Sequence, residues 1–391
     1  MSNLFLEKGE NVEQHTKKVI IYTAATGGGH LAAAKSLAEK IEKDGFEVKI
    51  VDAFKDNSRI LDLMINDGYS FLAKNLPYVY GKIYRFSAKK RVSYGVKKTL
   101  YILLQEKIVK ELYFFNADLI ISTHPLTTAL LSVLKKKRMV SLPCVTVVTD
   151  LEAHTFYLSE DMDAYVTGSE HTRKSLIQKG IPSERVYCFG IPVKPEFYHR
   201  KNISVEKINE RFSILVMGGS FGLKNIKNVF LSLMQIKSPL ELTVVCGNNR
   251  KLKEGLELIS KAFTNHKITI LGFTENVAQL MDTAEVIISK PGGLTLSEAM
   301  NKRIPMVIPF FIPGQEEENA EILSREKVAI VVKDSKELQS EIEKMIFDPS
   351  ILENMRLNIE YLVQDFSIES TAELIKKIAA KEAAYKIIEN V

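Results

Sequence analysis

Short runs of apolar residues alternate with longer amphipathic segments along almost the whole chain. Apolar runs bounded by glycine, proline or polar residues predict buried strands, and the segments between them predict helices. Such alternation is typical of parallel α/β units. The predicted strands are Lys18–Ala24, Glu47–Ala53, Asp118–Ser122, Cys144–Thr149, Ala164–Thr167 and Val186–Phe189, then Phe212–Met217, Glu241–Cys246, Lys267–Leu271, Glu285–Ser289, Pro305–Pro309 and Val328–Val332.

The strands fall into two series, which predict two domains. Glycine and proline cluster at Gly190–Pro195, and a polar stretch continues to Arg211, so this segment is the expected linker. Each series opens with a strand, a glycine-rich turn (Gly27–Gly29 and Gly218–Gly222) and a helix, as Rossmann-like domains do. We expect an α/β protein of two Rossmann-like domains facing a central cleft, divided into a polar tail 1–17, an N-terminal domain 18–200, a C-terminal domain 201–366 and a final helix 367–391 that packs back towards the first domain.

The composition narrows the class of protein. The 391 residues, 46% hydrophobic and 26% charged, suit a soluble globular protein with two full cores. No apolar run reaches the roughly 18–20 residues that span a bilayer, and Met1–Lys18 lacks an apolar signal sequence. Cys144, Cys188 and Cys246 stand singly in apolar runs, which favours a reduced, cytoplasmic protein.

The segment Ser289–Met300, SKPGGLTLSEAM, carries the most specific chemistry. It follows a predicted strand and opens a helix, so the turn at Gly292 and Gly293 leaves backbone N–H groups free to bind phosphate. Glu298 follows about one and a half turns later, where a carboxylate can accept hydrogen bonds from both ribose hydroxyls. Diphosphate beside ribose predicts a nucleotide, and the rest of the chain favours a nucleotide sugar.

His30 follows the first glycine-rich turn, and Asp150 follows the strand Cys144–Thr149. At a helix N-terminus the dipole keeps the His30 ring neutral, so it can accept a proton near neutral pH. Asp150 lies at a strand's carboxyl end, where ligands bind, although it can also cap a helix. The turn also fits G-x-G-x-x-A with Asp52 ending the next strand, so a dinucleotide site is an alternative.

Two further motifs concern sugar and metal. Pro313–Asn319, PGQEEEN, places Gln315, Glu316 and Asn319 at a helix start, where they suit sugar hydroxyls or simply form an acidic first turn. Asp161–Asp163 spells the D-x-D of metal-dependent sugar transferases but lies in a polar turn, and an Asp150–His154 metal pair lacks a third ligand. We therefore expect no metal.

Lys and Arg crowd the segment Lys74–Lys110, interleaved with Tyr and Phe, and Glu106 is its one acidic residue. Basic and aromatic residues together suit the headgroup region of an anionic lipid surface. A solvated face and a nucleic-acid surface are alternatives, but no nucleic-acid-binding motif accompanies the segment. The predicted membrane contacts are Lys82, Arg85, Lys89, Lys90 and Arg91.

Taken together, the motifs TGGGH, VVTDLEAH, GIPVKPEF, SKPGGLTLSEAM and PGQEEEN resemble glycosyltransferase family 28. That family contains plant monogalactosyldiacylglycerol synthases, bacterial diacylglycerol glucosyltransferases and the peptidoglycan N-acetylglucosaminyltransferase. The likeness covers nearly the whole chain and is greatest for the bacterial processive diacylglycerol β-glucosyltransferases. It implies a GT-B fold with an N-terminal acceptor domain and a C-terminal UDP-sugar domain, no required cofactor or metal, and inversion at the anomeric carbon.

The resemblance also implies site residues. Gly28 and Gly29 form an acceptor or phosphate loop, and either His30 or Asp150 is the general base. The implied UDP-sugar contacts are Gly219 and Ser220 near the diphosphate, the backbone of Phe273 at the uracil, Glu298 at the ribose, Gly292, Gly293 and Thr295 at the diphosphate, and Gln315, Glu316 and Asn319 at the sugar.

The expected activity is transfer of a hexose, with glucose favoured over galactose, from a UDP-sugar to diacylglycerol. The enzyme would act peripherally on the inner face of the cell membrane, giving β-glycosyl-diacylglycerol, with repeated transfer as a further implication. Alternatives are a polyprenyl-linked acceptor, a UDP-sugar 2-epimerase, or a nucleotide-sugar sensor without catalysis.

Overall fold

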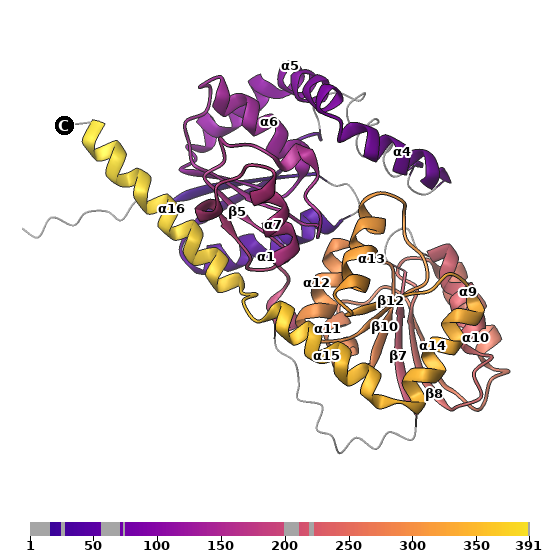
Figure 1. The fold of residues 1–391 in the computed structure, drawn as a ribbon. Coiled ribbons are helices and arrows are strands. Elements are labelled where there is room, and N and C mark those ends of the chain that lie inside the picture. Colours follow the sequence, from indigo (N-terminus) through magenta and orange to yellow (C-terminus); the bar gives the residue numbers. More distant parts are fainter. Residues whose placement is uncertain are drawn as a thin grey trace, which may run out of the picture.

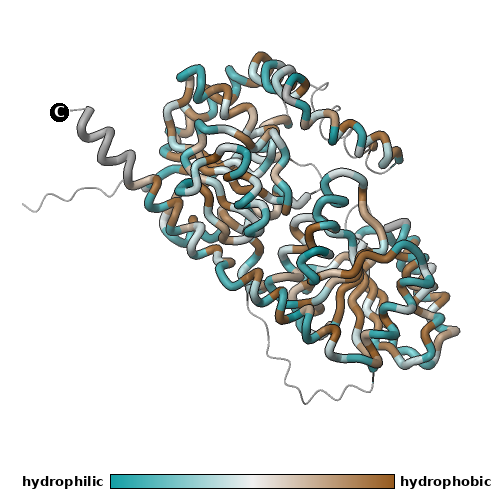
Figure 2. Tube along the Cα trace, in the orientation of Figure 1, coloured by the Kyte–Doolittle hydropathy of each residue, from teal (hydrophilic) through white to brown (hydrophobic). Residues whose placement is uncertain are grey.

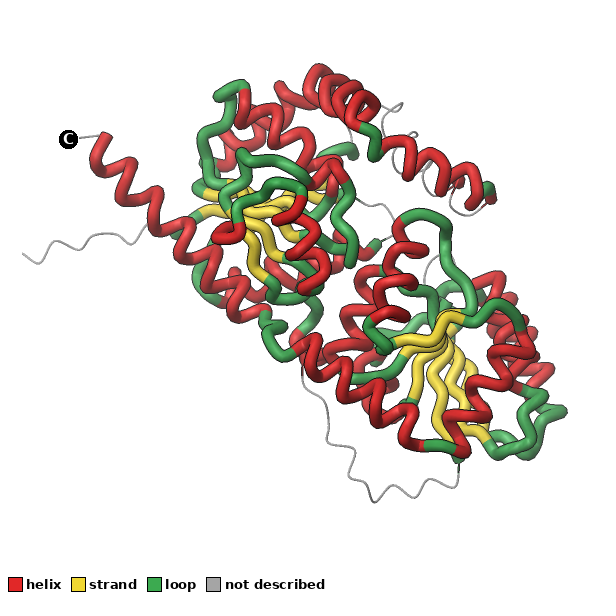
Figure 3. The backbone as a smooth tube through the Cα atoms, viewed as in Figure 1, coloured by secondary structure: helices red, strands yellow, loops and turns green. Residues whose placement is uncertain are grey.

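Two parallel six-stranded sheets organise the chain in the computed structural model, which describes residues 16–24, 28–55, 71–72, 75–198, 211–218 and 223–389 (Figures 1 and 3). The first sheet has the order β2-β1-β3-β4-β5-β6 and the second the order β12-β11-β10-β7-β8-β9. The strands are β1 Lys18–Thr23, β2 Glu47–Asp52, β3 Leu119–Ser122, β4 Cys144–Val147, β5 Ala164–Val166, β6 Val186–Tyr187, β7 Phe212–Met217, β8 Leu240–Val245, β9 Lys267–Leu271, β10 Val286–Ile288, β11 Met306–Ile308 and β12 Ala329–Val331.

All twelve predicted strands are present, and every pairing is parallel. Central strands such as β3, β4 and β10 are buried on both faces, because helices cover both sides of a parallel sheet. That is why they read as continuous apolar runs in the sequence. Figure 2 shows the strands of the second sheet largely in the hydrophobic colour. The predicted α/β class is therefore confirmed.

Helices cover both faces of each sheet. In the first domain α5 and α6 cover one face, and α1 with the last helix, α16, covers the other. In the second domain α11, α12, α13 and α15 lie on one face and α9, α10 and α14 on the other. The helices are α1 Gly29–Lys43, α4 Pro77–Ser87, α5 Lys90–Phe115, α6 Pro125–Lys136, α7 Glu170–Gln178, α8 Pro195–Tyr198, α9 Leu223–Leu233, α10 Arg250–Ser260, α11 Val277–Thr283, α12 Gly293–Asn301, α13 Gln315–Arg325, α14 Ser335–Phe347, α15 Pro349–Val363 and α16 Ile368–Glu389, with short 3-10 turns η2 Thr155–Tyr157 and η3 Ser183–Arg185.

The chain crosses back to the first domain at its end. Helix α16 leaves α15 and runs along the first sheet, where Ile368, Ala372 and Ile375 join the same apolar cluster as Val19 and Leu37 (Figure 1). The last helix thus connects the second domain to the core of the first.

The basic, aromatic segment, which lies between the second and third predicted strands, forms α4 and α5. Helix α5 packs against α6 through buried residues at helical spacing, namely Leu100, Leu104, Ile108 and Leu112. Helix α4 projects from the first domain over the second (Figure 1). Within the described ranges, no helix combines the length and apolar character needed to cross a bilayer.

Candidate active site

The two domains meet where the carboxyl ends of their central strands face each other, the place where α/β sheets bind ligands. The closest approach joins Gly293, at the start of α12, to the loop after β4. A Cβ atom on Gly293 would lie 2.1 Å from the carbonyl oxygen of Thr149 and 3.3 Å from Oδ1 of Asp150. Only glycine fits at this position. The glycine turn that was predicted to bind phosphate therefore also allows the two domains to approach this closely.

His30 lies in the first turn of α1, behind Gly28, whose φ of 83° favours glycine. Its Nδ1 lies 3.0 Å from the carbonyl oxygen of Thr123 and 2.6 Å from Oγ1 of Thr149. A carbonyl oxygen only accepts, so we assign the ring proton to Nδ1, which leaves Nε2 unprotonated. Burial lowers the pKa of His30 to about 4. The ring is neutral at pH 7, as predicted, but burial is the main cause in the structure.

Asp150 is buried in the loop that follows β4, the β4 loop, and accepts a hydrogen bond from the side-chain amide of Gln315. Burial raises the pKa of Asp150 to about 7; Glu318 and Glu316 raise it further, whereas the Gln315 hydrogen bond opposes the rise. A carboxyl group with this pKa changes its charge near neutral pH. The contact with Gln315 also joins a candidate base of the first domain to a predicted sugar contact of the second.

We expect Asp150→Asn to stabilise the protein in a pH-dependent way. The pKa is 3.8 in the unfolded chain and about 7 in the folded one. The folded protein therefore keeps a proton that the unfolded chain releases, and the free energy of unfolding falls as pH rises from 4 to 7. The free energy of unfolding of the variant does not fall in this way. In the wild type the fall is at most about 4 kcal/mol, since each pKa unit corresponds to about 1.36 kcal/mol.

Thermal unfolding checks this expectation. The melting temperature of Asp150→Asn should exceed that of the wild type above pH 7, and the two should converge near pH 4. A difference between the two proteins that stays constant from pH 4 to pH 8 would contradict the raised pKa of Asp150.

A cavity of about 260 Å³ lies beside these groups. Its apolar wall includes Leu72, Tyr80, Ile83, Leu126 and Phe156, and its polar end includes His30, His124, Asp150, His154 and Gln315. A larger hollow of about 870 Å³ lies between α5 and α6 and contains none of the predicted catalytic residues. The smaller cavity combines acid–base groups with room for an apolar substrate, so it is the candidate acceptor site.

His154 forms part of the cavity wall. Its Nδ1 accepts a hydrogen bond from the backbone N–H of Phe156, and its Nε2 lies 3.2 Å from Oγ of Ser87. The ring also packs against Tyr84, with 4.9 Å between centroids. Both ring nitrogens of His154 thus have protein partners, which fits a role in positioning the cavity wall.

The donor side centres on the start of α12. Helix α12 begins after Gly292 with no capping side chain, so its first N–H groups are left for a ligand. Lys290 precedes this turn and pairs with Glu316, which also accepts from the backbone N–H of Ile312 at 3.0 Å. We did not predict Lys290 as a site residue from the sequence. The signal that could have identified it is a lysine directly before the Pro-Gly-Gly turn. Thr295 lies in the first turn of α12.

The predicted nucleoside contacts lie farther along the second domain. Glu298 is partly buried on α12; burial raises its pKa to about 8, nearby Glu196 raises it as well, and Lys194 lowers it. Phe273 is 69% exposed in the loop after β9, which suits a backbone contact better than a packed ring. Gly219 and Ser220 lie outside the described residues.

Asn319 joins the two domains through hydrogen bonds of its side chain. Its Oδ1 accepts from the backbone N–H of Leu151 at 3.0 Å, and its Nδ2 donates to the carbonyl oxygen of Pro291 at 3.0 Å. The side chain is fully buried. Both amide atoms therefore join the β4 loop to the turn before α12, and the sugar contact of Asn319 stays a prediction.

The predicted membrane contacts lie on and between α4 and α5. Lys82 and Arg91 are exposed, and Nζ of Lys89 lies 5.2 Å from the centroid of the Phe86 ring. Arg85 pairs with Glu317 of α13 at 3.0 Å, so its charge is partly engaged within the protein. Lys90 begins α5, and its side chain lies outside the described part. Large apolar side chains are exposed on the same helices, among them Tyr78, Val79, Ile83, Phe86, Tyr94 and Ile102.

Comparisons with known proteins agree with this geometry. Residues 30–193 match the family model of monogalactosyldiacylglycerol (MGDG) synthase, and residues 213–378 match that of the glycosyltransferase family 28 C-terminal domain. A processive diacylglycerol beta-glucosyltransferase of Bacillus cereus (strain B4264) is 29% identical over 355 residues, covering 87% of this chain and 88% of the relative. One of Bacillus mycoides (strain KBAB4) is 28% identical over 383 residues, covering 94% of both.

Solved structures share the fold. MurG of Acinetobacter baumannii superposes with a TM-score of 0.64 at 16% identity, covering 92% of this chain and 99% of its own. UDP-GlcNAc 2-epimerase of Neisseria meningitidis superposes with a TM-score of 0.57 at 15% identity, covering 93% and 100%. The predicted GT-B fold and the predicted enzyme class are thus confirmed: the chain is a glycosyltransferase of GT-B fold whose N-terminal part matches the MGDG synthase model and whose C-terminal part matches the family 28 C-terminal model.

Proposed function

We propose that the protein transfers a hexose from a UDP-sugar to diacylglycerol at a membrane surface, with inversion to a β-glycoside. The observation that carries the proposal is the cavity whose apolar wall leads to His30 and Asp150, opposite the uncapped start of α12. The names of the relatives point to the same acceptor and to glucose as the sugar.

The acceptor side of the proposal rests on polarity. Diacylglycerol has two acyl chains and one free hydroxyl, so its site needs an apolar wall and a polar end that holds a base. Tyr80, Ile83 and Phe156 supply such a wall, and His30 and Asp150 lie at the polar end. A polyprenyl-linked sugar would also bring the polar groups of its sugar and diphosphate to this cavity.

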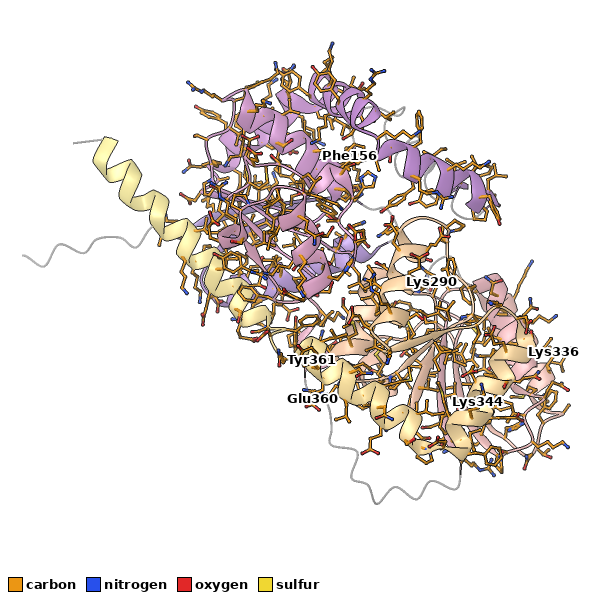
Figure 4. All side chains as sticks on the ribbon, viewed as in Figure 1. Phe156, Lys290, Lys336, Lys344, Glu360 and Tyr361 are labelled. Atoms are coloured by element: carbon orange, nitrogen blue, oxygen red, sulfur yellow. The ribbon has the colours of Figure 1, made fainter. Side chains whose placement is uncertain are left out.

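The donor side rests on electrostatics. The N–H groups at the start of α12 and the ammonium of Lys290 would stabilise the negative charge that develops on the departing diphosphate. Figure 4 shows Lys290 on the edge of the second domain that faces the first domain. Phe156 is labelled on the first domain. These groups are preorganised in the protein, so the leaving group can be stabilised without a metal ion.

In the proposed reaction His30 acts as the base. Its Nδ1–H is fixed by the carbonyl oxygen of Thr123, so Nε2 can take the proton of the glycerol hydroxyl. The hydroxyl oxygen attacks C1 of the hexose on the face opposite the diphosphate, the C1–O bond breaks, and UDP leaves with the electron pair. A bound diphosphate would raise the pKa of His30, which burial lowers, and this rise favours the proton transfer.

Membrane contact would involve the basic residues at the start of α5 and directly before it. Replacing Lys89, Lys90 and Arg91 together by glutamine should weaken binding to phosphatidylglycerol vesicles on the order of a hundredfold, because each basic residue near an anionic surface contributes about 1 kcal/mol. Sedimentation with vesicles at low salt measures this.

The matched control replaces Lys333, Lys336 and Lys344, which lie on or beside α14; Figure 4 shows the latter two far from α4. That variant should bind vesicles like the wild type. Unchanged vesicle binding by the Lys89–Arg91 variant would refute membrane contact through this segment.

Direct product analysis tests donor and acceptor together. The wild-type protein is incubated with UDP-glucose or UDP-galactose and vesicles containing diacylglycerol, and the lipids are analysed by mass spectrometry. We expect hexosyl-diacylglycerol from UDP-glucose, and a series of longer products if transfer repeats. Intact donor and lipid in both reactions would refute the proposed acceptor.

A further inference from the structure

Helix α4 of the first domain lies against the loop that leads into α13 of the second (Figure 1). A Cβ atom on Gly81 would lie 2.7 Å from Cβ of Pro313, and one on Gly314 would lie 3.0 Å from Cδ1 of Tyr84. The backbone of Gly314 has φ of 103°, a conformation that favours glycine. The two segments therefore touch as closely as their backbones allow.

Two polar contacts reinforce this approach. The hydroxyl of Tyr84 donates to Oε2 of Glu318 at 3.0 Å, and the guanidinium of Arg85 donates to Oε2 of Glu317 at 3.0 Å. Glu317 also accepts from the backbone N–H of Gly314 at 3.1 Å, which caps α13. Burial raises the pKa of the Tyr84 hydroxyl, so the tyrosine keeps its proton at neutral pH and donates to Glu318. Helix α4 thus holds the first turn of α13.

The same first turn carries the residues proposed to bind the donor sugar. Gln315 and Glu316 precede Glu317 and Glu318, and the Gln315 amide already reaches Asp150 across the domain boundary. The adjoining face of α4 lines the acceptor cavity, through Ile83 and Tyr84 among others. One tyrosine thus contacts both the acceptor cavity and the helix that would bind the donor.

We propose that α4 is a clamp between the two substrate sites, and that Tyr84 and Glu318 are positioning residues that couple an acceptor in the cavity to the placement of Gln315 and Glu316. The inference rests on the proposed function. An acceptor that fills the cavity restricts α4, α4 restricts the first turn of α13, and the donor hexose meets residues already in place. Such coupling is reciprocal, so each substrate tightens the binding of the other.

The first test compares UDP-glucose with UDP in calorimetric titrations of wild-type protein and Tyr84→Phe. The variant keeps the ring and loses the bond to Glu318. We expect its affinity for UDP-glucose to fall about tenfold, the effect of losing one hydrogen bond to a charged group. Its affinity for UDP should be unchanged, because UDP has no hexose. Tyr361→Phe, an exposed tyrosine on α15 labelled in Figure 4, should change neither affinity.

The second test measures the coupling itself. A diacyl-propanediol, which lacks the acceptor hydroxyl and cannot react, is supplied in mixed micelles. It should tighten UDP-glucose binding severalfold in wild-type protein and have no such effect in Tyr84→Phe. In a double-mutant cycle, Glu318→Ala should add little to the loss caused by Tyr84→Phe, because both remove the same bond.

Several outcomes would overturn the clamp. Equal weakening of UDP and UDP-glucose would show a general structural defect, and an unchanged UDP-glucose affinity would show that the bond does not position α13. If wild-type protein makes glycolipid but the diacyl-propanediol leaves donor binding unchanged, the coupling is refuted while the proposed function stands. Wild-type protein that binds neither UDP nor UDP-glucose refutes the proposed function, and the clamp with it.

Discussion

Replacing His30 by alanine should lower the rate of sugar transfer by about a hundredfold to ten-thousandfold, the usual contribution of a positioned general base. The ring is held by the Thr123 carbonyl oxygen and by Thr149, so alanine removes the base and leaves the backbone of α1 in place. The affinity for UDP should stay nearly the same, since UDP would bind at α12 in the other domain. Initial rates with diacylglycerol vesicles and calorimetric titration of UDP measure the two quantities.

A matched substitution separates this effect from the loss of any buried imidazole. His266→Asn removes a ring whose Nδ1 accepts from the backbone N–H of Leu240, on the far part of the second sheet, and keeps an acceptor there. That variant should transfer sugar at the wild-type rate. Full activity of His30→Ala would move the role of base to Asp150, and loss of UDP binding would refute the assignment of His30 to the acceptor side.

Replacing Gly293 by alanine should lower transfer by about a hundredfold or more. The new Cβ would lie 2.1 Å from the carbonyl oxygen of Thr149, a backbone atom that cannot turn away. The turn before α12 must then move from the β4 loop, which separates the proposed diphosphate site from His30 and Asp150. Misplacing reacting groups by about 1 Å costs on the order of a hundredfold in rate.

The control for this prediction is another glycine on a helix of the same domain. Gly255 lies within α10, and a Cβ atom there would meet no atom within 4 Å. Gly255→Ala should keep full activity and gain roughly 0.5–1 kcal/mol of stability. Circular dichroism should give wild-type spectra for both variants. A fully active Gly293→Ala would contradict the close domain contact as a requirement for catalysis.

The sheets could be predicted because their signals are local. Each strand of a buried parallel sheet is a continuous apolar run, and the glycine-rich turns at Gly28 and Gly292 mark where the strands end. Ligands of parallel sheets bind beyond the carboxyl ends of the strands, and from this rule we predicted that His30 and Asp150 lie in one region. The structure places both at one cavity.

The contacts between the domains could not be predicted in this way. Tyr84 and Glu318 are 234 positions apart, and Gln315 and Asp150 are 165 apart, so no local pattern records that they meet. Asn319 shows the same difficulty: a buried amide that joins two loops has the same sequence signature as one that binds a sugar. The acceptor cavity likewise depends on α4, whose position is set by these long-range contacts.

The central claim is that a hexose is transferred from UDP to an acceptor lipid beside His30, with inversion at the anomeric carbon. The most direct measurement is nuclear magnetic resonance of the glycolipid formed by wild-type protein from UDP-glucose and diacylglycerol. A β-configured anomeric proton on a glucosyl-diacylglycerol is the predicted result. An α-configured product, or no lipid product while UDP is released, would contradict the account.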